Sequence, residues 1–273
     1  MRLLIFADCH VHSTMSADAK DSYEDETESA IQKGLGIICF TEHADDCCTG
    51  LAAARRSYLA DRHTINDHFA AAKGLYGNRI QMYHGIELGN ILHSPEKAQQ
   101  VSALPELDFI IGSLHAMRGC VDFCRITYTD GEQCRDIARR YMAECLAAAK
   151  VGCCDVFGHL GYIQRYMARQ GQGVNMLEFT DEFRTLFLEL INAGIGIEVN
   201  TSGLRDKANT PFPLPPLVKL YRECGGEIIT VGSDAHTAED VGRGIPEAYE
   251  LLKDCGFRYV AVFKKRKPEF LPL

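Results

Sequence analysis

Short apolar runs alternate with longer amphipathic stretches along the chain. The runs have the length of buried strands, and the stretches between them carry apolar residues at helical spacing. The predicted strands are residues 3–6, 37–40, 80–86, 109–111, 156–157, 195–199 and 228–231. The predicted helices are residues 23–33, 65–76, 133–150, 176–192, 214–223 and 245–253, with 259–263 as a candidate last strand. This alternation predicts an α/β protein with a parallel sheet covered by helices.

Polar side chains follow the C-terminal end of every predicted strand. In chain order they are His10 with His12, Glu42 with His43, Glu87, His115, His159, Asn200, and Asp234 with His236. An open sheet concentrates its site at one switch point, whereas a closed barrel brings all its strand ends to one mouth. The pattern therefore favours a single-domain barrel. The segments 44–64, 89–107, 116–132 and 201–213 are predicted to be loops around the pocket.

His10 and His12 indicate a metal site. They are two residues apart, so an extended backbone points both imidazoles to the same side. Six of the ten histidines sit at strand ends, together with Glu87 and Asp234, and the rest are predicted to be ordinary polar residues. One catalytic ion takes three or four protein ligands, so this set predicts two or three ions. Nitrogen and oxygen ligands without cysteine suit zinc, iron or manganese.

Composition and charge exclude several classes of partner. The chain of 273 residues has a formal net charge of −8 and no stripe of Lys and Arg that could track a phosphate backbone, so nucleic acid is not an expected partner. No apolar run approaches the roughly 20 residues of a membrane span. The N-terminus lacks a full signal-peptide core, which predicts a cytoplasmic protein. The basic run 264–267 is predicted to be a solvated tail, and no oligomeric state is indicated.

The 12 cysteines are predicted to be thiols, because disulfides are rare in the cytosol and the adjacent pairs at 47–48 and 153–154 suit them poorly. The segment from Cys134 to Arg140 has the Cys-x5-Arg spacing of cysteine phosphatases. It contains no glycine for a phosphate-cradling turn and has a strong helical pattern, so we predict a helix surface there.

A series of motifs resembles the polymerase-and-histidinol-phosphatase (PHP) domain family, in order and over nearly the whole chain. The matching segments are Asp8-Cys9-His10-Val11-His12-Ser13, Ser16-Ala17-Asp18, Phe40-Thr41-Glu42-His43-Ala44-Asp45, Gly85-Ile86-Glu87-Leu88-Gly89, Gly112-Ser113-Leu114-His115, Gly158-His159-Leu160, Glu198-Val199-Asn200-Thr201-Ser202-Gly203-Leu204-Arg205 and Gly232-Ser233-Asp234-Ala235-His236. The stretches 158–166 and 200–205 resemble the histidinol-phosphate phosphatase branch. The resemblance implies one domain over residues 1–273, folded as a distorted (β/α)7 barrel of the TIM type.

The resemblance also implies a trinuclear metal centre of divalent ions. On that pattern the ligands of the three ions are, in turn, His10, His12, Glu87 and Asp234; Glu87, His115 and His159, with Glu87 bridging; and Asp18, His43 and His236. Some relatives have histidine where this chain has Asp18. Arg165 and Arg205 are implied as phosphate-binding residues, and a guanidinium can grip phosphate through two hydrogen bonds.

The activity implied by the resemblance is hydrolysis of L-histidinol phosphate to L-histidinol and phosphate, in histidine biosynthesis. Two ions bind phosphate oxygens and lower the pKa of a water, so that a metal-bound hydroxide attacks phosphorus directly. The catalytic candidates are Glu87, Asp234 and His236. The proton for the leaving alkoxide is expected from Asp234, His236 or a metal-bound water.

Three alternatives stay open. Another phosphoester, such as a nucleotide, a sugar phosphate or a phosphotyrosyl protein, would use the same site. An amidohydrolase-type C–N hydrolase also places HxH and a late Asp on barrel strands, but it often bridges its metals with a carboxylated lysine, and this chain has Glu87 there. A non-catalytic metal-binding module is disfavoured because every ligand position is retained. For a cationic substrate, Glu42, Asp45 and Asp46 are hypothetical contacts.

Overall fold

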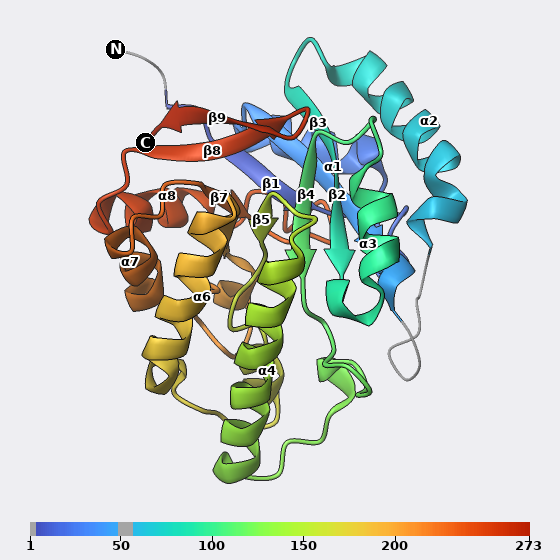
Figure 1. Ribbon diagram of the computed structural model, residues 1–273. Coiled ribbons are helices and arrows are strands. Elements are labelled where there is room, and N and C mark those ends of the chain that lie inside the picture. Colours follow the sequence, from blue (N-terminus) through green and yellow to red (C-terminus); the bar gives the residue numbers. More distant parts are fainter. Residues whose placement is uncertain (1–3, 49–56) are drawn as a thin grey trace.

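The structure is a computed structural model that describes residues 4–48 and 57–273. At its centre lies one sheet of seven strands in the spatial order β1 to β7 (Figure 1). The strands are β1 (Ala7–Val11), β2 (Ile37–Ala44), β3 (Gln81–Gly89), β4 (Phe109–Ser113), β5 (Val156–Phe157), β6 (Gly196–Asn200) and β7 (Ile229–Gly232). Every neighbouring pair is parallel, so all the C-terminal ends face one side.

The sheet closes almost completely into a barrel, because β1 and β7 meet along a seam. A parallel bridge joins Val11 to Ala235. The Asp234 N–H donates to the His10 carbonyl at 2.7 Å, and the His12 N–H donates to the Ala235 carbonyl at 2.9 Å. The prediction of a seven-stranded barrel rather than an open sheet is confirmed.

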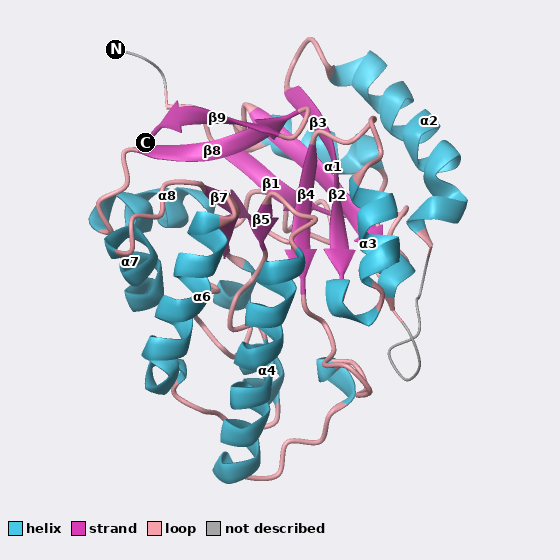
Figure 2. Cartoon of the chain, in the orientation of Figure 1, coloured by secondary structure: helices cyan, strands magenta, loops and turns pink. Residues whose placement is uncertain are grey.

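Helices cover the outside of the barrel (Figure 2). They are α1 (Tyr23–Gln32), α2 (Tyr58–Tyr76), α3 (Pro95–Ser102), α4 (Gly131–Val151), α5 (Ile163–Arg169), α6 (Thr180–Asn192), α7 (Pro215–Glu223) and α8 (Ile245–Asp254). Short 3-10 helices lie in the connections: η1 (Asp45–Cys47), η3 (Ile91–His93), η4 (Phe123–Arg125), η5 (Met176–Phe179) and η6 (Ser202–Arg205). All six predicted helices are present. Among the described helices, none is both long enough and apolar enough to span a bilayer.

Capping side chains explain where two of these helices begin. Ser22 and Asp25 form a reciprocal capping box at the start of α1, and Asp130 accepts the Gln133 N–H at 2.9 Å at the start of α4. Within α4, Cys134 is buried and Arg140 is exposed. The segment is helical as predicted, although the cysteine faces the core instead of the surface.

The first strand begins later than predicted. It starts at Ala7, and the side chains of Leu4 and Ile5 are 41% and 42% exposed, while residue 3 lies outside the described residues. All five residues of β1 are buried, including Asp8 and His10. An apolar pattern cannot detect a strand whose buried residues are polar, which explains the error.

A hairpin covers the N-terminal ends of the barrel strands, which we call the base (Figure 1); its first strand matches the predicted strand at 259–263, and its second strand was not predicted. It consists of β8 (Tyr259–Lys264) and β9 (Lys267–Pro272), which pair antiparallel as a separate sheet. Phe263 stacks on Phe109 with 5.0 Å between ring centroids. Arg266 Nε lies 2.5 Å from Asp155 Oδ2. The expectation of a tail at 264–267 was therefore wrong, because these residues form the hairpin turn, which Arg266 anchors, while the three lysines are exposed to solvent as expected.

Candidate metal centre

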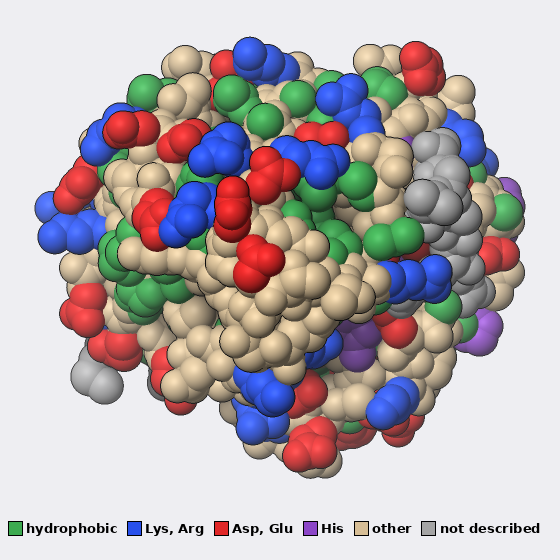
Figure 3. Space-filling view, turned by 90° about the horizontal axis from the view of Figure 1, so that it is seen from below, with side chains coloured by type: hydrophobic (Ala, Val, Ile, Leu, Met, Phe, Trp, Pro, Cys, Tyr) green, Lys and Arg blue, Asp and Glu red, His purple; other side chains and the backbone are tan. Residues whose placement is uncertain are grey.

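The C-terminal ends of the strands surround a cavity of about 160 Å³, which we call the mouth. Figure 3 views the protein from this side, and a purple histidine patch is visible below and to the right of the middle, beside acidic and basic side chains. The cavity is lined by seven predicted ligands: Asp18, His43, Glu87, His115, His159, Asp234 and His236. The other two, His10 and His12, are fully buried beside them.

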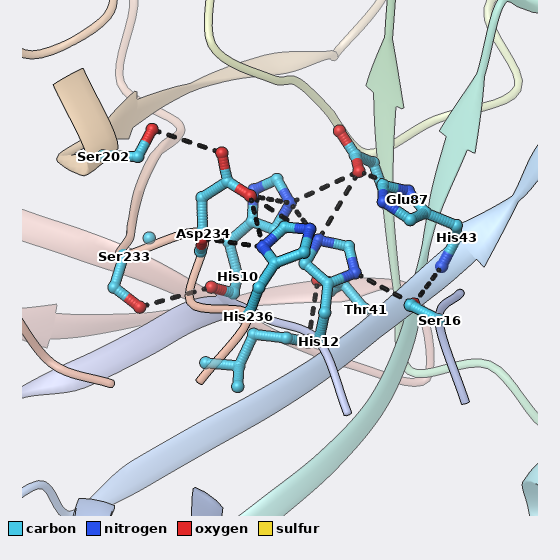
Figure 4. A network of polar contacts seen from close by, with 12 residues as sticks. His10, His12, Ser16, Thr41, His43, Glu87, Ser202, Ser233, Asp234 and His236 are labelled. Atoms are coloured by element: carbon cyan, nitrogen blue, oxygen red, sulfur yellow. Dashed lines mark hydrogen bonds and ion pairs between the residues drawn. The ribbon is translucent and has the colours of Figure 1, made fainter. Parts of the chain in front are cut away.

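The first predicted group is compact (Figure 4). His10 Nε2 and His12 Nε2 are 3.1 Å apart, and they lie 3.8 and 3.7 Å from Asp234 Oδ1. Glu87 Oε2 approaches the same two nitrogens at 3.6 and 3.5 Å. Two imidazole nitrogens turned towards each other and flanked by two carboxylates are a donor set that fits a divalent cation.

The second predicted group uses the other oxygen of the same glutamate. Glu87 Oε1 lies 3.0 Å from His115 Nε2 and 2.7 Å from His159 Nε2. Because Oε1 faces this group and Oε2 faces the first, Glu87 occupies the position between them. Gly85 keeps β3 close to its neighbours, since a Cβ there would lie 2.8 Å from the Phe109 carbonyl oxygen.

The third predicted group lies farther out. Asp18 Oδ1 is 3.4 Å from His43 Nε2 and 3.6 Å from His236 Nε2. The side chain of Asp18 is 37% exposed, whereas that of Glu87 is 2% exposed. His43 Nδ1 also reaches Glu87 Oε2 at 2.9 Å, and His12 forms a compact group with His43 and His236. The structure thus brings all nine predicted ligands together, and none of the other four histidines joins a donor group among the described residues.

The electrostatics of the cluster keep its carboxylates ionised. Burial alone would raise the pKa of Glu87, but the neighbouring His115 and His10 hold that pKa well below its usual value. Burial and the neighbouring His43 lower the pKa of His12 well below its usual value, so that its imidazole is neutral. Ionised carboxylates and neutral imidazoles are the forms that bind metal ions. Burial alone would lower the pKa of His10 and His43, but neighbouring carboxylates raise it well above its usual value, so these two rings must lose a proton when an ion binds.

The two predicted phosphate-binding arginines lie in different surroundings. The Arg165 guanidinium lines the cavity between the rings of Tyr162 and Phe212, at 4.9 and 5.6 Å from their centroids. Its Nη2 is 3.4 Å from Asp234 Oδ2, and its buried Nε has no partner among the described residues. The guanidinium of Arg165 therefore lies beside the metal-binding groups, with one N–H that no described residue accepts.

Arg205 instead holds the backbone that follows β7. Its Nη1 donates to the Ser233 carbonyl at 2.7 Å and its Nη2 to the Asp234 carbonyl at 2.8 Å, while Nε lies 3.2 Å from Asp240. Asp234 has φ +55°, a conformation that is uncommon outside glycine. Arg205 thus fixes the turn that carries Asp234, and its contact with phosphate stays a prediction.

Two of the three hypothetical acidic contacts have other roles, so those assignments were wrong. Glu42 is fully buried and accepts hydrogen bonds from Ser13 and Ser16. Asp46 accepts the Tyr58 N–H at 2.8 Å at the start of α2. Both positions precede loops, and nothing in the apolar pattern distinguishes a capping or buried carboxylate from a free one. Asp45 does line the cavity, and so does Asp122, which the sequence did not single out.

Sequence reasoning also missed the residues behind the histidines. His10 Nδ1 lies 2.6 Å from Glu198 Oε1. His12 Nδ1 lies 3.2 Å from Ser16 Oγ, which donates to Glu42 Oε2 at 2.6 Å. The position of Glu198 on a strand between two apolar residues was the available clue, because a carboxylate at such a position must find a buried partner.

The model of the PHP domain matches residues 8–202 of the chain. The protein therefore belongs to the PHP domain family, as the motifs predicted. It is 27% identical to the probable histidinol-phosphatase of Clostridium acetobutylicum, over 95% of this chain and 97% of the relative. It is also 27% identical to the histidinol-phosphatase of Lactococcus lactis, over 95% of each chain.

Solved structures show the same fold. The crystal structure of histidinol phosphate phosphatase from Lactococcus lactis, complexed with zinc, L-histidinol and phosphate, superposes with a TM-score of 0.80 and 26% identity, covering 98% of this chain and 100% of that one. A putative histidinol phosphatase from Listeria monocytogenes superposes with a TM-score of 0.72 and 17% identity, over 88% of this chain and 99% of that one. The predicted barrel and its family are confirmed.

Proposed function

We propose that the protein is a metal-dependent phosphomonoesterase that hydrolyses L-histidinol phosphate to L-histidinol and phosphate, in histidine biosynthesis. The observation that carries the proposal is one cavity that is lined by both the metal-binding groups and the guanidinium of Arg165. A phosphate monoester needs both, because its oxygens carry negative charge that cations and N–H donors neutralise. The Lactococcus relative, with zinc, L-histidinol and phosphate bound, supports the substrate.

We propose three divalent ions in this centre, of zinc, iron or manganese. His10, His12, Glu87 and Asp234 would hold the first; Glu87, His115 and His159 the second; Asp18, His43 and His236 the third. When bound, such ions neutralise phosphate oxygens and lower the pKa of a water to generate the nucleophile. The zinc in the Lactococcus relative supports this metal for the centre.

The protein's own side chains would then bind and orient the substrate. Glu87 holds the first and second groups, which we call the inner groups, at a fixed separation, since its two oxygens face different histidines. Arg165 binds the phosphate through its guanidinium, which lines the cavity and contacts two aromatic rings. His236 Nδ1 lies 3.6 Å from Asp234 Oδ1 beside the cavity. The proton that the leaving alkoxide takes up would come from one of these residues or from a metal-bound water.

The cavity also has anionic side chains for a cationic leaving group. Asp45 and Asp122 line it without belonging to the donor groups. Asp122 Oδ1 accepts the Cys124 N–H at 2.8 Å, which fixes the carboxylate at the cavity wall. Their charge would attract the amine and imidazole of histidinol. Among the described residues that line the cavity there is no lysine, which argues against a bridging carboxylated lysine and a C–N hydrolase.

We further propose that the whole chain, residues 1–273, acts as one catalytic domain in the cytoplasm. The family match ends at residue 202, but β7, Asp234 and His236 lie beyond it and complete the barrel and its mouth. All 12 cysteines are free thiols, which supports a reducing compartment.

Phosphate release from a substrate panel tests the function. The purified protein, loaded with Zn²⁺, Mn²⁺ or Fe²⁺, is assayed with L-histidinol phosphate, p-nitrophenyl phosphate, a nucleotide, a sugar phosphate and a phosphotyrosyl peptide. We expect the highest kcat/KM for L-histidinol phosphate. If p-nitrophenyl phosphate is hydrolysed as fast, the substrate assignment fails. Absence of phosphate release with every substrate and metal would exclude the phosphatase activity itself.

A further inference from the structure

Glu198 is a fully buried carboxylate that contacts no part of the cavity directly. It lies on β6, and its side chain has no exposed surface. Its Oε1 lies 2.6 Å from His10 Nδ1. Its Oε2 accepts the backbone N–H of His159 at 2.9 Å and the Asn200 side-chain amide at 3.1 Å. Each oxygen of this carboxylate therefore has a hydrogen-bond donor.

The contact with His10 fixes which nitrogen of that imidazole faces the cavity. An ionised carboxylate only accepts hydrogen bonds, so His10 Nδ1 must carry the proton in this contact. The lone pair of the neutral ring is then on Nε2, which faces His12 Nε2 and Glu87 Oε2. A histidine that ligates a metal needs this second hydrogen bond to set its tautomer and its ring orientation.

The contacts of Glu198 Oε2 extend to His159, a member of the second metal-binding group, and through Asn200 to Asp234. The His159 N–H that Glu198 accepts belongs to a residue with φ +26°, an uncommon conformation that needs outside support. Asn200 Nδ2 also lies 3.4 Å from Asp234 Oδ2. One carboxylate thus supports a side chain on β1, a backbone turn after β5 and, through Asn200, the aspartate after β7.

Glycine provides the space for this carboxylate. A Cβ on Gly232 would lie 2.5 Å from Glu198 Oε1 and 2.3 Å from His10 Cβ, closer than real side chains pack. The sequence of β7 therefore leaves room for the contact between Glu198 and His10. The third group, Asp18, His43 and His236, which we call the outer group, has no such support. None of the contacts of Glu198 involves these residues.

We propose that Glu198 is a positioning residue that sets the tautomer of His10 and couples the two inner metal groups by holding His10 and His159 in one hydrogen-bond network. The inference rests on the proposed metal centre. It assigns to Glu198 a role that neither the family match nor the relatives' names describe.

Glu198→Gln tests the proposal, because glutamine keeps the shape but cannot accept on both sides. If its oxygen accepts from His10, its NH₂ group meets the N–H of His159 and the amide of Asn200, donor against donor. If it is flipped, its NH₂ group donates to His10 Nδ1, and the ring proton moves to Nε2, where it blocks ligation. Either arrangement weakens an inner site.

The measurement is competition for Zn²⁺ between the metal-free protein and a chromophoric chelator. We expect the affinity of the inner sites to fall by roughly 10- to 100-fold in Glu198→Gln, with the outer site unchanged. Glu26→Gln is the matched control, since Glu26 is also fully buried but has no contact with the donor groups, and it should bind Zn²⁺ like the wild type. Equal affinities in Glu198→Gln and wild type would overturn the proposal. A wild type that binds no Zn²⁺ would overturn the metal centre first.

A second measurement needs no variant and stays informative if Glu198→Gln does not fold. Nitrogen-15 NMR spectra of the histidine rings in the Zn²⁺-loaded wild type report which ring nitrogen carries a proton. The expected result is a protonated Nδ1 on His10, slow to exchange because Glu198 and His10 have no exposed surface. A His10 ring without a proton on Nδ1 would overturn the proposal.

Discussion

The two ends of the barrel bury opposite kinds of side chain. At the mouth, His10, His12 and Glu87 are buried to within 1% of their surface. At the base, the hairpin buries Val262 and Phe263 against the apolar ends of the strands. Burial of apolar surface stabilises a fold by about 25 cal/mol per Å², whereas burial of charged groups costs free energy unless they are paired.

The packing that stabilises the fold and the groups that carry the chemistry therefore lie at separate ends of the same strands. The base should tolerate substitutions without loss of activity as long as the protein folds. The mouth should lose activity without loss of the fold, because its buried charges do not contribute the main packing energy.

Glu87→Gln should have the largest effect. The amide cannot accept through both atoms, so the two inner groups lose their shared carboxylate. We expect kcat/KM for L-histidinol phosphate to fall on the order of 10³-fold, while the circular dichroism spectrum stays that of the wild type. Phosphate-release kinetics and metal analysis measure the change. An activity within tenfold of the wild type would contradict the shared role of Glu87.

Phe263→Ala should destabilise the base and leave the mouth unaffected. Removing a 5%-exposed ring that stacks on Phe109 should lower the free energy of unfolding by about 3–4 kcal/mol. Urea denaturation of the metal-free protein measures this loss. Phe270, on the same hairpin and 47% exposed, provides the control, and Phe270→Ala should change stability by less than about 0.5 kcal/mol. A loss of kcat/KM at 20 °C in folded Phe263→Ala would show that the ends are coupled.

Arg165→Lys should lower kcat/KM by about 100-fold, since an ammonium keeps the charge but loses the planar fork of N–H groups. The inhibition constant of inorganic phosphate should rise in parallel.

Arg205→Lys tests the second predicted phosphate contact. Weaker phosphate inhibition in this variant would support that contact, whereas lower stability with unchanged inhibition would leave Arg205 only as the clamp on the Ser233 and Asp234 carbonyls.

Glu26 tests how a buried carboxyl group away from the mouth affects the stability of the fold. Burial, reinforced by Asp21 and Asp8, raises its pKa from 4.5 to about 9, so the folded protein binds a proton that the unfolded chain releases across this range. The free energy of unfolding should therefore decrease as the pH rises from 4.5 to 9. Glu26→Gln should remove the decrease and stabilise the protein by about 2 kcal/mol at pH 6. Denaturation curves at pH 5 and pH 8 decide, and equal slopes in both proteins would contradict the prediction.

Asp122→Asn should have the smallest effect and should depend on the substrate. We expect KM for L-histidinol phosphate to rise about tenfold, equivalent to the loss of one partly exposed charge contact, with KM for p-nitrophenyl phosphate unchanged. Asp45→Asn should act in the same direction. Asp46→Asn is the control, because Asp46 is bonded to the start of α2. Equal changes with both substrates would remove Asp122 from leaving-group recognition.

The strands and donor groups could be predicted because both follow from position along the chain. Apolar runs fix the strands, and parallel strands bring the residues after each run to one mouth, as with Glu87 and His115. The start of β1 could not be predicted in this way, because its buried residues include Asp8 and His10. Helix α3 lies in the segment 89–107, which was predicted to be a loop. It buries only Ala98 and Val101, too few positions for a helical period to be recognised in the sequence.

Other features depend on tertiary partners that no local pattern contains. Arg266 pairs with Asp155, which is 111 positions away, so a basic run looked like a tail. Glu198 and His10 are 188 positions apart, and Arg205 is 28 positions from the Ser233 carbonyl that it clamps. A motif shows that such residues belong to the family, but only the folded geometry shows what each one contacts.

The seam between β1 and β7 has a consequence for synthesis of the chain. The first donor group contains His10 and His12 on one side of the seam and Asp234 on the other. A nascent chain that has not yet emerged past residue 234 therefore lacks part of that group, however well its earlier helices have formed. Contacts between distant parts of a chain form late because loop closure costs entropy. The protein should thus be able to hold the ion of its first group only late in folding, when β1 and β7 meet.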